Sequence, residues 1–184
     1  MIEILKEWDR DLFVYLNNLG IERFDSFWLF VTQIDTWTPL FIFLILLIYY
    51  YYKPRKGTVV FIFTVLVFVV ALGLTNLTKD FVGRLRPNNA PELAELIRAL
   101  QKPNNFSFFS GHASSSFAVT TFIVLALRKY TKWIYFVFIW PLLFITSRIY
   151  VGVHYPSDIM VGALVGTSIA FVGYYFCNKT LRKI

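Results

Sequence analysis

The chain has 184 residues, enough for one ordinary domain and too few for two. Hydrophobic residues make up 57% of it and charged residues only 16%, against about 45–50% and about 25% in soluble domains. This composition excludes an ordinary soluble protein and predicts an integral membrane protein, with residues 1–184 as a single transmembrane domain. The single cysteine, Cys177, excludes an internal disulfide, and with two histidines it leaves too few ligands for a Cys/His zinc cage.

The N-terminal region has helical periodicity but is too polar to span a membrane. We expect an amphipathic helix over residues 3–19 that lies in the membrane interface and is not removed as a signal peptide. Residues 24–34 are apolar but short. They form either a sixth, tilted span or an interfacial helix leading into the first span, and we favour the interfacial interpretation. The apolar positions of the first helix are Leu5, Trp8, Leu12, Tyr15, Leu16 and Leu19.

Five longer apolar stretches approach the length of about 17–25 residues that crosses a bilayer as a helix. No stretch has the period-two alternation of a transmembrane barrel. We therefore expect an all-α bundle of five to six transmembrane helices, preceded by the amphipathic helix. The stretches are residues 38–52, 58–78, 113–127, 133–147 and 157–177.

Basic residues gather in three connectors that contain no acid, residues 53–56, 128–132 and 179–183. The positive-inside rule makes these connectors cytoplasmic. The connectors 79–112 and 148–156 then face the outside. Because this topology accounts for nine of the 18 basic residues, the net charge of +7 gives no reason to expect a nucleic-acid partner.

Titratable residues beside membrane helices are costly and therefore suggest function. Here titratable residues and their Ser, Gly and Pro neighbours form three clusters on the expected outer face, and both histidines belong to these clusters. Each cluster alone has a structural explanation, as snorkelling anchors, as a helix cap or as the first turn of a helix. The clusters are Lys79, Arg84, Arg86 and Pro87; Ser110, Gly111 and His112; and Ser147, Arg148, His154 and Asp158.

Taken together, the clusters describe a site for a phosphate group. Three cations, Lys79, Arg86 and Arg148, can surround a phosphoryl group, and an arginine can bind two oxygens at once. Ser110 and its neighbours precede an apolar helix, whose free N–H groups and dipole favour an anion. Gly111 allows the backbone to come close to that anion.

Two histidines supply the reactive groups. His154 and Asp158 are four residues apart, so the carboxylate can reach one ring nitrogen and leave the other as a nucleophile or base. His112 is then free to protonate the leaving oxygen. One carboxylate is too few for a Mg²⁺-dependent phosphoryl transfer, so we expect no metal and no cofactor.

The same residues resemble the signatures of the type 2 phosphatidic acid phosphatase family, the membrane branch of a superfamily shared with vanadium haloperoxidases. Residues 79–87 (KDFVGRLRP) match the signature KxxxxxxRP, and residues 147–158 (SRIYVGVHYPSD) match SRxxxxxHxxxD in full. Residues 109–112 (FSGH) match PSGH except that Phe109 replaces its proline. The three matches occur in the family's order.

The resemblance implies a role for each matching residue. His154 would attack phosphorus and become a transient phosphohistidine, Asp158 would orient it, and His112 would protonate the leaving group. Arg84 lies outside the signatures, and its role stays open. The residues implied to hold the phosphoryl oxygens are Lys79, Arg86, Ser110, Gly111 and Arg148.

The resemblance also implies a helical membrane phosphatase acting on a phosphorylated lipid, with membrane lipids around it and no obligatory protein partner evident. The small size is similar to bacterial members, which implies the bacterial inner membrane with the site on its outer face. Undecaprenyl pyrophosphate is the favoured substrate, and phosphatidylglycerol phosphate, phosphatidic acid and lipid A are alternatives. A transporter or flippase that binds lipid phosphate without hydrolysis is the alternative of another class. It would need the cations but neither histidine.

Two further segments have structural or functional interpretations. The connector 88–106 can contain a short helix over residues 91–101, either a lid over the pocket or an interfacial helix that closes the fold, and we favour the second. Gly162 and Gly166 form a GxxxG pattern, for which we favour helix packing within the monomer over a dimer seam. The apolar side of the connector helix would carry Leu93, Leu96, Ile97 and Leu100.

Overall fold

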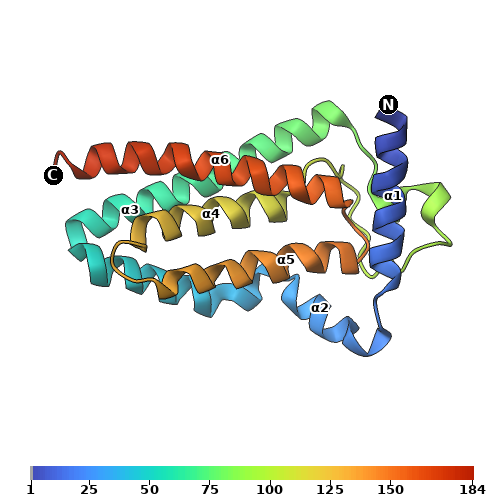
Figure 1. Cartoon of the computed structure of the whole chain (residues 1–184), viewed down its shortest axis with the longest axis horizontal. Helices are drawn as coiled ribbons and strands as arrows, with labels where there is room; N and C mark the ends of the chain where they lie inside the picture. The colour runs from blue at the N-terminus through green and yellow to red at the C-terminus, as the bar shows by residue number, and fades with distance from the viewer. Residues whose placement is uncertain (1) are drawn as a thin grey trace.

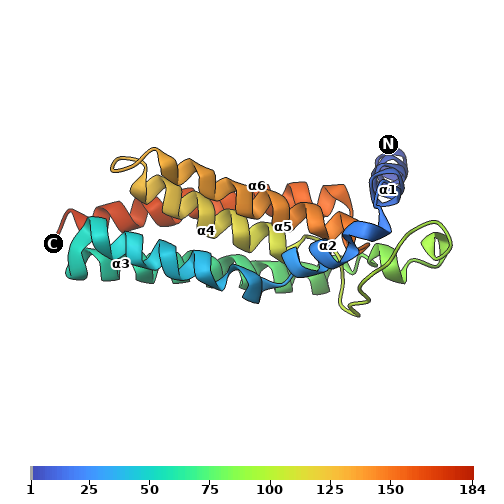
Figure 2. The ribbon, with the colours of Figure 1, turned by 90° about the horizontal axis from the view of Figure 1, so that it is seen from below.

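The computed structural model describes residues 2–184 as a bundle of long helices with short segments across one end (Figures 1 and 2). No strand occurs in these residues, so the all-α prediction is confirmed. The helices are α1 (Ile2–Asn18), α2 (Asp25–Val31), α3 (Thr38–Val82), α4 (Gly111–Leu127), α5 (Ile139–Tyr150) and α6 (Pro156–Leu181). Short 3-10 helices are η1 (Glu22–Phe24), η2 (Ile34–Trp37), η3 (Pro87–Asn89), η4 (Pro91–Leu93) and η5 (Trp133–Phe138).

The α3 helix contains two of the predicted spans, folded back on each other at a sharp elbow. Lys53 leaves helical geometry with φ 60° and ψ 167°, and Pro54 follows it. A proline removes a helical hydrogen bond, which is why the break falls here. The two arms run in opposite directions, from blue-cyan to green in Figures 1 and 2. Across the elbow, the side-chain oxygens of Tyr49 and Thr58 lie 3.2 Å apart.

The long helices divide the bundle into two chemically different ends. The three basic connectors, 53–56, 128–132 and 179–183, meet at one end, which we call the basic end (Figure 1). The connectors after α3 and after α5 lie at the other, the site end. Three segments are long and apolar enough to cross a membrane: Ile34–Leu93, Trp133–Tyr150 and Pro156–Leu181. The helix α4 is apolar but shorter.

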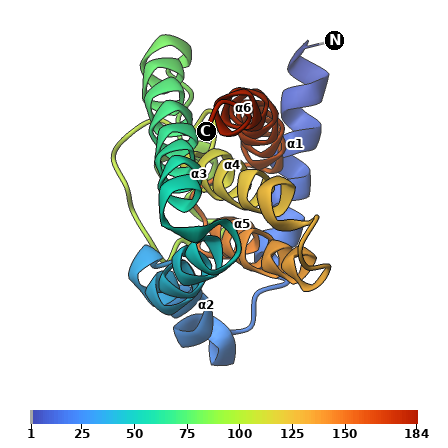
Figure 3. The same cartoon turned by 90° about the vertical axis from the view of Figure 1, so that its left-hand side faces the viewer.

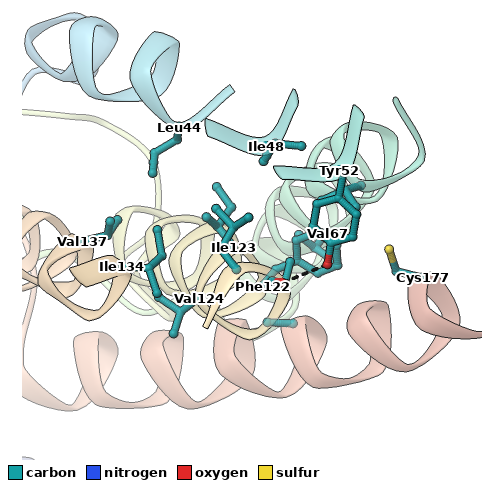
Figure 4. Close-up of a cluster of buried hydrophobic side chains, with 14 residues drawn as sticks. Leu44, Ile48, Tyr52, Val67, Phe122, Ile123, Val124, Ile134, Val137 and Cys177 are labelled. Atoms are coloured by element: carbon teal, nitrogen blue, oxygen red, sulfur yellow. Dashed lines mark hydrogen bonds between the residues drawn. The ribbon is translucent and has the colours of Figure 1, made fainter. Parts of the chain in front are cut away.

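The core forms around α4, which lies between α3 and α6 (Figure 3). Side chains from both arms of α3 pack on it. The Tyr52 hydroxyl donates a hydrogen bond to the carbonyl of Ala126 at 2.8 Å, drawn as a dashed line from Tyr52 in Figure 4. Burial of this apolar layer joins the spans into one body. Its buried members include Leu44, Ile48, Val67, Phe122, Ile123 and Ile134.

The GxxxG pattern packs within the monomer, as predicted. A side-chain carbon on Gly166 would lie 2.1 Å from the carbonyl oxygen of Ser114, and one on Gly162 would lie 2.7 Å from that of Ser110. Only glycine therefore lets α6 come this close to α4. Since Ser110 directly precedes α4, this packing also sets the position of one predicted site segment.

The α1 helix lies across the site end, roughly perpendicular to the bundle (Figures 1 and 3). Its inward face contains Phe13 and Asn17, both fully buried. The Asn17 side chain donates hydrogen bonds to the carbonyl of Ile149, at 2.9 Å, and to that of Tyr150, at 3.0 Å. The predicted apolar stripe faces outward, with Trp8 67% exposed, as expected of a helix that offers this stripe to lipid.

The segment that leads into α3 is too short to be a span of its own. The α2 helix has seven residues, about 10 Å of helix, against a hydrocarbon core of about 30 Å. It continues through η2 into α3. These lengths agree with the interfacial interpretation of residues 24–34.

The predicted helix over residues 91–101 is wrong. Only η4 forms there, followed by turns. The backbone N–H of Arg98 donates to the Asn17 side chain at 2.7 Å, and that of Leu100 donates to the carbonyl of Val151 at 3.1 Å. These donors bond to other segments, so the helical pattern is lost. Leu93 is still fully buried and packs against Phe13.

Candidate active site

The end of α3 positions the first cluster of predicted site residues. Gly83 adopts the left-handed conformation, with φ 62°, and its N–H donates to the carbonyl of Lys79 at 2.9 Å. This is a common glycine stop signal for a helix. Lys79 stays on the last turn, 7% exposed, while Arg86 follows in the connector, 4% exposed. Two cations are thus buried at the site end.

The second cluster forms the start of α4. The Ser110 hydroxyl caps this helix by accepting a hydrogen bond from the N–H of Ala113 at 3.4 Å. The N–H of Ser110 donates to the carbonyl of Asp158 at 3.0 Å, which ties the start of α4 to the start of α6. Gly111 and His112 follow in the first turn, and the His112 ring lies 4.7 Å from that of Phe144 on α5.

The third cluster brings a histidine and a carboxylate together. Nδ1 of His154 lies 3.5 Å from Oδ2 of Asp158. The same oxygen accepts a hydrogen bond from the N–H of Tyr155 at 3.0 Å, which holds the carboxylate in the first turn of α6. Nε2 of His154 points away from the carboxylate and lies 3.0 Å from a guanidinium nitrogen of Arg86.

The surroundings of His154 favour its neutral form. Burial lowers its pKa well below the usual value, and the positive charges of Arg86, Arg148 and Lys79 lower it further. A neutral imidazole has a lone pair on one nitrogen. With Nδ1 facing Asp158, that lone pair falls on Nε2, beside the cations.

The two site arginines are held in fixed positions, but one donor is left free. Arg86 donates to the carbonyl of Val153 at 2.9 Å and to the Asn105 side chain at 2.9 Å. Arg148 donates to Thr32 and, at 3.1 Å, to Gln101. Its Nε is buried and has no hydrogen-bond partner in residues 2–184, so it is available to an anion.

A charged network behind the carboxylate was not predicted from the sequence. Arg84 donates to Oδ1 of Asp158 at 2.8 Å and to Oδ2 of Asp9, on α1, at 2.7 Å. Asp9 also accepts a hydrogen bond from the N–H of Ser157 at 2.8 Å. The Ser107 hydroxyl donates to Oδ2 of Asp158. Two features of the sequence could have indicated this network: Asp9 in the N-terminal amphipathic helix, and Arg84, which lies two positions before the signature residue Arg86.

All eight predicted site residues lie at the site end, and none is exposed. Direct contacts join His154, Asp158, Arg86 and Ser110. Among residues 2–184, no side-chain hydrogen bond joins Lys79, His112 or Arg148 to these four residues. The arrangement offers cations and a helix N-terminus for a phosphate group, and a neutral imidazole backed by a carboxylate for nucleophilic attack. The predicted residues are Lys79, Arg86, Ser110, Gly111, His112, Arg148, His154 and Asp158.

Two known proteins with similar sequences are phosphatases by name. A lipid A 4'-phosphatase of Bacteroides thetaiotaomicron is 30% identical over all of this chain and 83% of its own length. An undecaprenyl-diphosphatase of Sulfolobus acidocaldarius is 30% identical over 88% of this chain and 75% of its own length.

A solved structure shares the fold. The crystal structure of a transmembrane PAP2-type phosphatidylglycerolphosphate phosphatase from Bacillus subtilis matches with a TM-score of 0.75 at 22% identity, covering 96% of this chain and 87% of that one. Residues 59–182 match the PAP2 superfamily, and this range includes all three clusters. Together with the site, these similarities support a phosphatase activity on lipid phosphates. The chain is an integral membrane protein of the PAP2 superfamily.

Proposed function

We propose that residues 1–184 act as one lipid phosphatase domain that hydrolyses its substrate through a phosphohistidine on His154. The observation that carries this proposal is the pairing of His154 Nδ1 with Asp158, which leaves Nε2 toward the cations. In the first step Nε2 bonds to phosphorus while the bond from phosphorus to the lipid oxygen breaks. His112, in the protonated form that the negative charge of the bound phosphate favours, gives its proton to that oxygen, so the lipid leaves as an alcohol or as a monophosphate.

In the second step, water attacks the phosphohistidine. The bond between phosphorus and Nε2 breaks, His112 takes a proton from the water, and inorganic phosphate leaves. The charge that develops on the phosphoryl oxygens is stabilised by fixed donors. We assign this task to Lys79, Arg86, Ser110, Gly111 and Arg148. The unpaired Nε of Arg148 supports the assignment, because it is a buried donor that a phosphoryl oxygen would satisfy.

Two substrates are candidates. Undecaprenyl pyrophosphate, favoured by the sequence, is supported by the similarity to the Sulfolobus enzyme. Lipid A is supported by the similarity to the Bacteroides enzyme, which extends over the whole chain. The positions of the basic connectors support an orientation with the site on the outer face of the bacterial inner membrane.

The first test is phosphate release by the purified full-length protein in detergent with EDTA present. The panel contains undecaprenyl pyrophosphate, lipid A, phosphatidylglycerol phosphate and phosphatidic acid. We expect release that is lost in His154→Ala, and the ranking of rates identifies the substrate. Release that EDTA abolishes and Mg²⁺ restores would contradict the metal-free mechanism. Binding of lipid without any release would instead support the transporter or flippase alternative.

A second test separates the two histidines. An aryl phosphate has a leaving group that needs no proton, so His112→Ala should still form the phosphohistidine from it, while His154→Ala should not. In a single turnover of an aryl phosphate whose phosphoryl group is radiolabelled, the labelled protein is trapped. A phosphohistidine is identified because its label is stable in alkali and lost in acid. Equal defects of both variants on the aryl phosphate would contradict the assignment of His112 as the acid.

A further inference from the structure

A cavity of about 450 Å³ lies at the basic end, opposite the candidate active site, and we name it the basic pocket. Three segments meet there: the elbow of α3, the turn after α4 and the end of α6 (Figure 1). Among the described residues, none of those lining it is acidic. The lining residues that determine its chemistry are Lys53, Lys56, Lys129, Arg182, Tyr52 and Tyr130.

The four cations of the basic pocket have no acidic partners in the part of the chain from residue 2 to 184. The salt bridges of that part lie in α1 or at the site end. The 11 acidic residues also belong to segments at the site end. Positive charges that share a cavity repel one another, and an anion between them replaces repulsion with attraction. The pocket therefore has the charge of an anion site.

Aromatic side chains give this pocket fixed walls. The ammonium group of Lys129 lies 5.0 Å from the ring centroid of Tyr52 and 4.7 Å from that of Tyr130. The Tyr130 ring stacks on Tyr51 with centroids 5.0 Å apart. Tyr52 is itself held by its hydrogen bond to Ala126. Cations that are placed before binding lose less freedom when a ligand arrives.

The backbone conformation of Lys53 also indicates a binding site for a ligand. Its φ of 60° with ψ of 167° is a combination found essentially only in glycine. The backbone of a lysine in this conformation is strained, and residues with strained backbones are often found where a protein binds a ligand. A glycine here would relieve the strain but would remove one of the four cations.

The surroundings of the pocket indicate where its ligand comes from. Large aromatic side chains at the basic end point outward, with Tyr50 78% and Tyr175 63% exposed. Tyrosines in this position mark the boundary between the bilayer and water. Basic pockets between helices at that boundary are typical sites for the headgroups of anionic lipids.

We propose that the basic pocket binds a phosphate group, presented by an anionic phospholipid of the leaflet opposite the active site. The phosphate lies among the four cations of the basic pocket, Lys53, Lys56, Lys129 and Arg182, and the acyl chains of the lipid run along the outside of the bundle. This site is independent of the catalytic site and supplies no group to it. Its occupancy stabilises the junction of α3, α4 and α6.

The test measures Tm and retained lipid, by native mass spectrometry, for the full-length protein in a nonionic detergent. The added probes are phosphatidylglycerol, phosphatidylcholine with the same acyl chains, and inorganic phosphate at matched ionic strength. We expect phosphatidylglycerol to remain bound and to raise Tm by about 5 °C at saturation. Phosphatidylcholine should give no comparable shift. An equal shift with inorganic phosphate would support the phosphate site and assign it to the free anion.

Two triple variants separate the pocket from the general charge of the basic end. Lys56→Gln, Lys129→Gln and Arg182→Gln together remove three pocket cations. Arg55→Gln, Arg128→Gln and Lys183→Gln, the matched control, remove three sequence neighbours that do not line the pocket. We expect the pocket variant to bind phosphatidylglycerol at least tenfold more weakly and the control to bind as wild type. Equal losses in both, or no preference for phosphatidylglycerol in the wild type, would overturn the proposal.

A single variant provides a second measurement that does not depend on a triple mutant folding. Lys53→Gly removes one cation and the strained lysine backbone. We expect a higher Tm in phosphatidylcholine and a smaller rise on addition of phosphatidylglycerol. An unchanged rise would contradict a role for Lys53 in the site.

Discussion

Arg84 donates a hydrogen bond to Oδ1 of Asp158 at 2.8 Å, while the other carboxylate oxygen faces the ring of His154. The same guanidinium reaches Asp9 on α1. A residue outside the family signatures thus holds the carboxylate that orients the proposed nucleophile. It also connects this carboxylate to a helix that lies across the end of the bundle. We regard Arg84 as a positioning residue.

Arg84→Gln should lower kcat on the order of 10–100-fold and leave KM nearly unchanged, because a misplaced Asp158 no longer holds His154 in line. Arg84→Lys, which keeps the charge, should restore part of the rate. Arg23→Gln, an exposed arginine at the same end, is the control. The measurement is steady-state phosphate release. A rise in KM with unchanged kcat would show that Arg84 binds substrate instead.

Asp9→Asn should reduce kcat by a smaller factor, about tenfold, since Arg84 keeps its bond to Asp158 but loses its anchor on α1. Asp11→Asn, an exposed acid of the same helix, should behave as wild type. Combined with Arg84→Gln, the Asp9 substitution should add little, because both act through one network. The double-mutant cycle measures this coupling, and strictly additive effects would mean that the two residues act separately.

The pH dependence of kcat/KM should reflect the positive charges around His154. Its pKa is lowered, so the neutral, reactive form persists as the pH falls and is lost only well below the usual histidine range. Arg84 is one of the charges that lower this pKa. Arg84→Gln should therefore move the acidic limb of kcat/KM to higher pH. The substrate phosphate also titrates near pH 6, so the comparison uses both enzymes on one substrate; coincident limbs would contradict the prediction.

Gly166→Ala should lower stability by about 1–3 kcal/mol, because the new methyl group would overlap the backbone of Ser114. Gly73→Ala is the matched control, since a side-chain carbon there meets nothing within 4 Å. It should stay within about 1 kcal/mol of wild type or be slightly more stable. Thermal unfolding in detergent, followed by tryptophan fluorescence, measures both. Equal stability of the two variants would mean that α6 can move away from α4 without cost.

The features predicted correctly from the sequence depend on composition, periodicity and spacing. Apolar runs identified the long helices, and the basic connectors at residues 53–56 and 128–132 lie at one end, as the charge rule requires. The spacing of His154 and Asp158 predicted their contact because both belong to one local turn. These properties are local, so a single sequence contains them.

The features that sequence analysis missed depend on contacts between distant segments. Asp9 and Arg84 are 75 positions apart and meet only after α1 lies across the bundle. The helix predicted over residues 91–101 failed because Arg98 bonds to Asn17, which is 81 positions away. The periodicity of a segment does not reveal which distant groups compete for its backbone donors.

The shortness of α4 has a consequence for access to the site. Its 17 residues measure about 26 Å, less than a hydrocarbon core of about 30 Å. Arg128 and Lys129, directly after it, anchor its far end at the membrane boundary. Its first turn, with the candidate active site, then lies below the level of the surrounding headgroups. Because α4 lies inside the bundle, with most of its residues buried, this depth forms a recess within the protein, and under the proposed function a lipid phosphate must leave the level of the headgroups to reach His154.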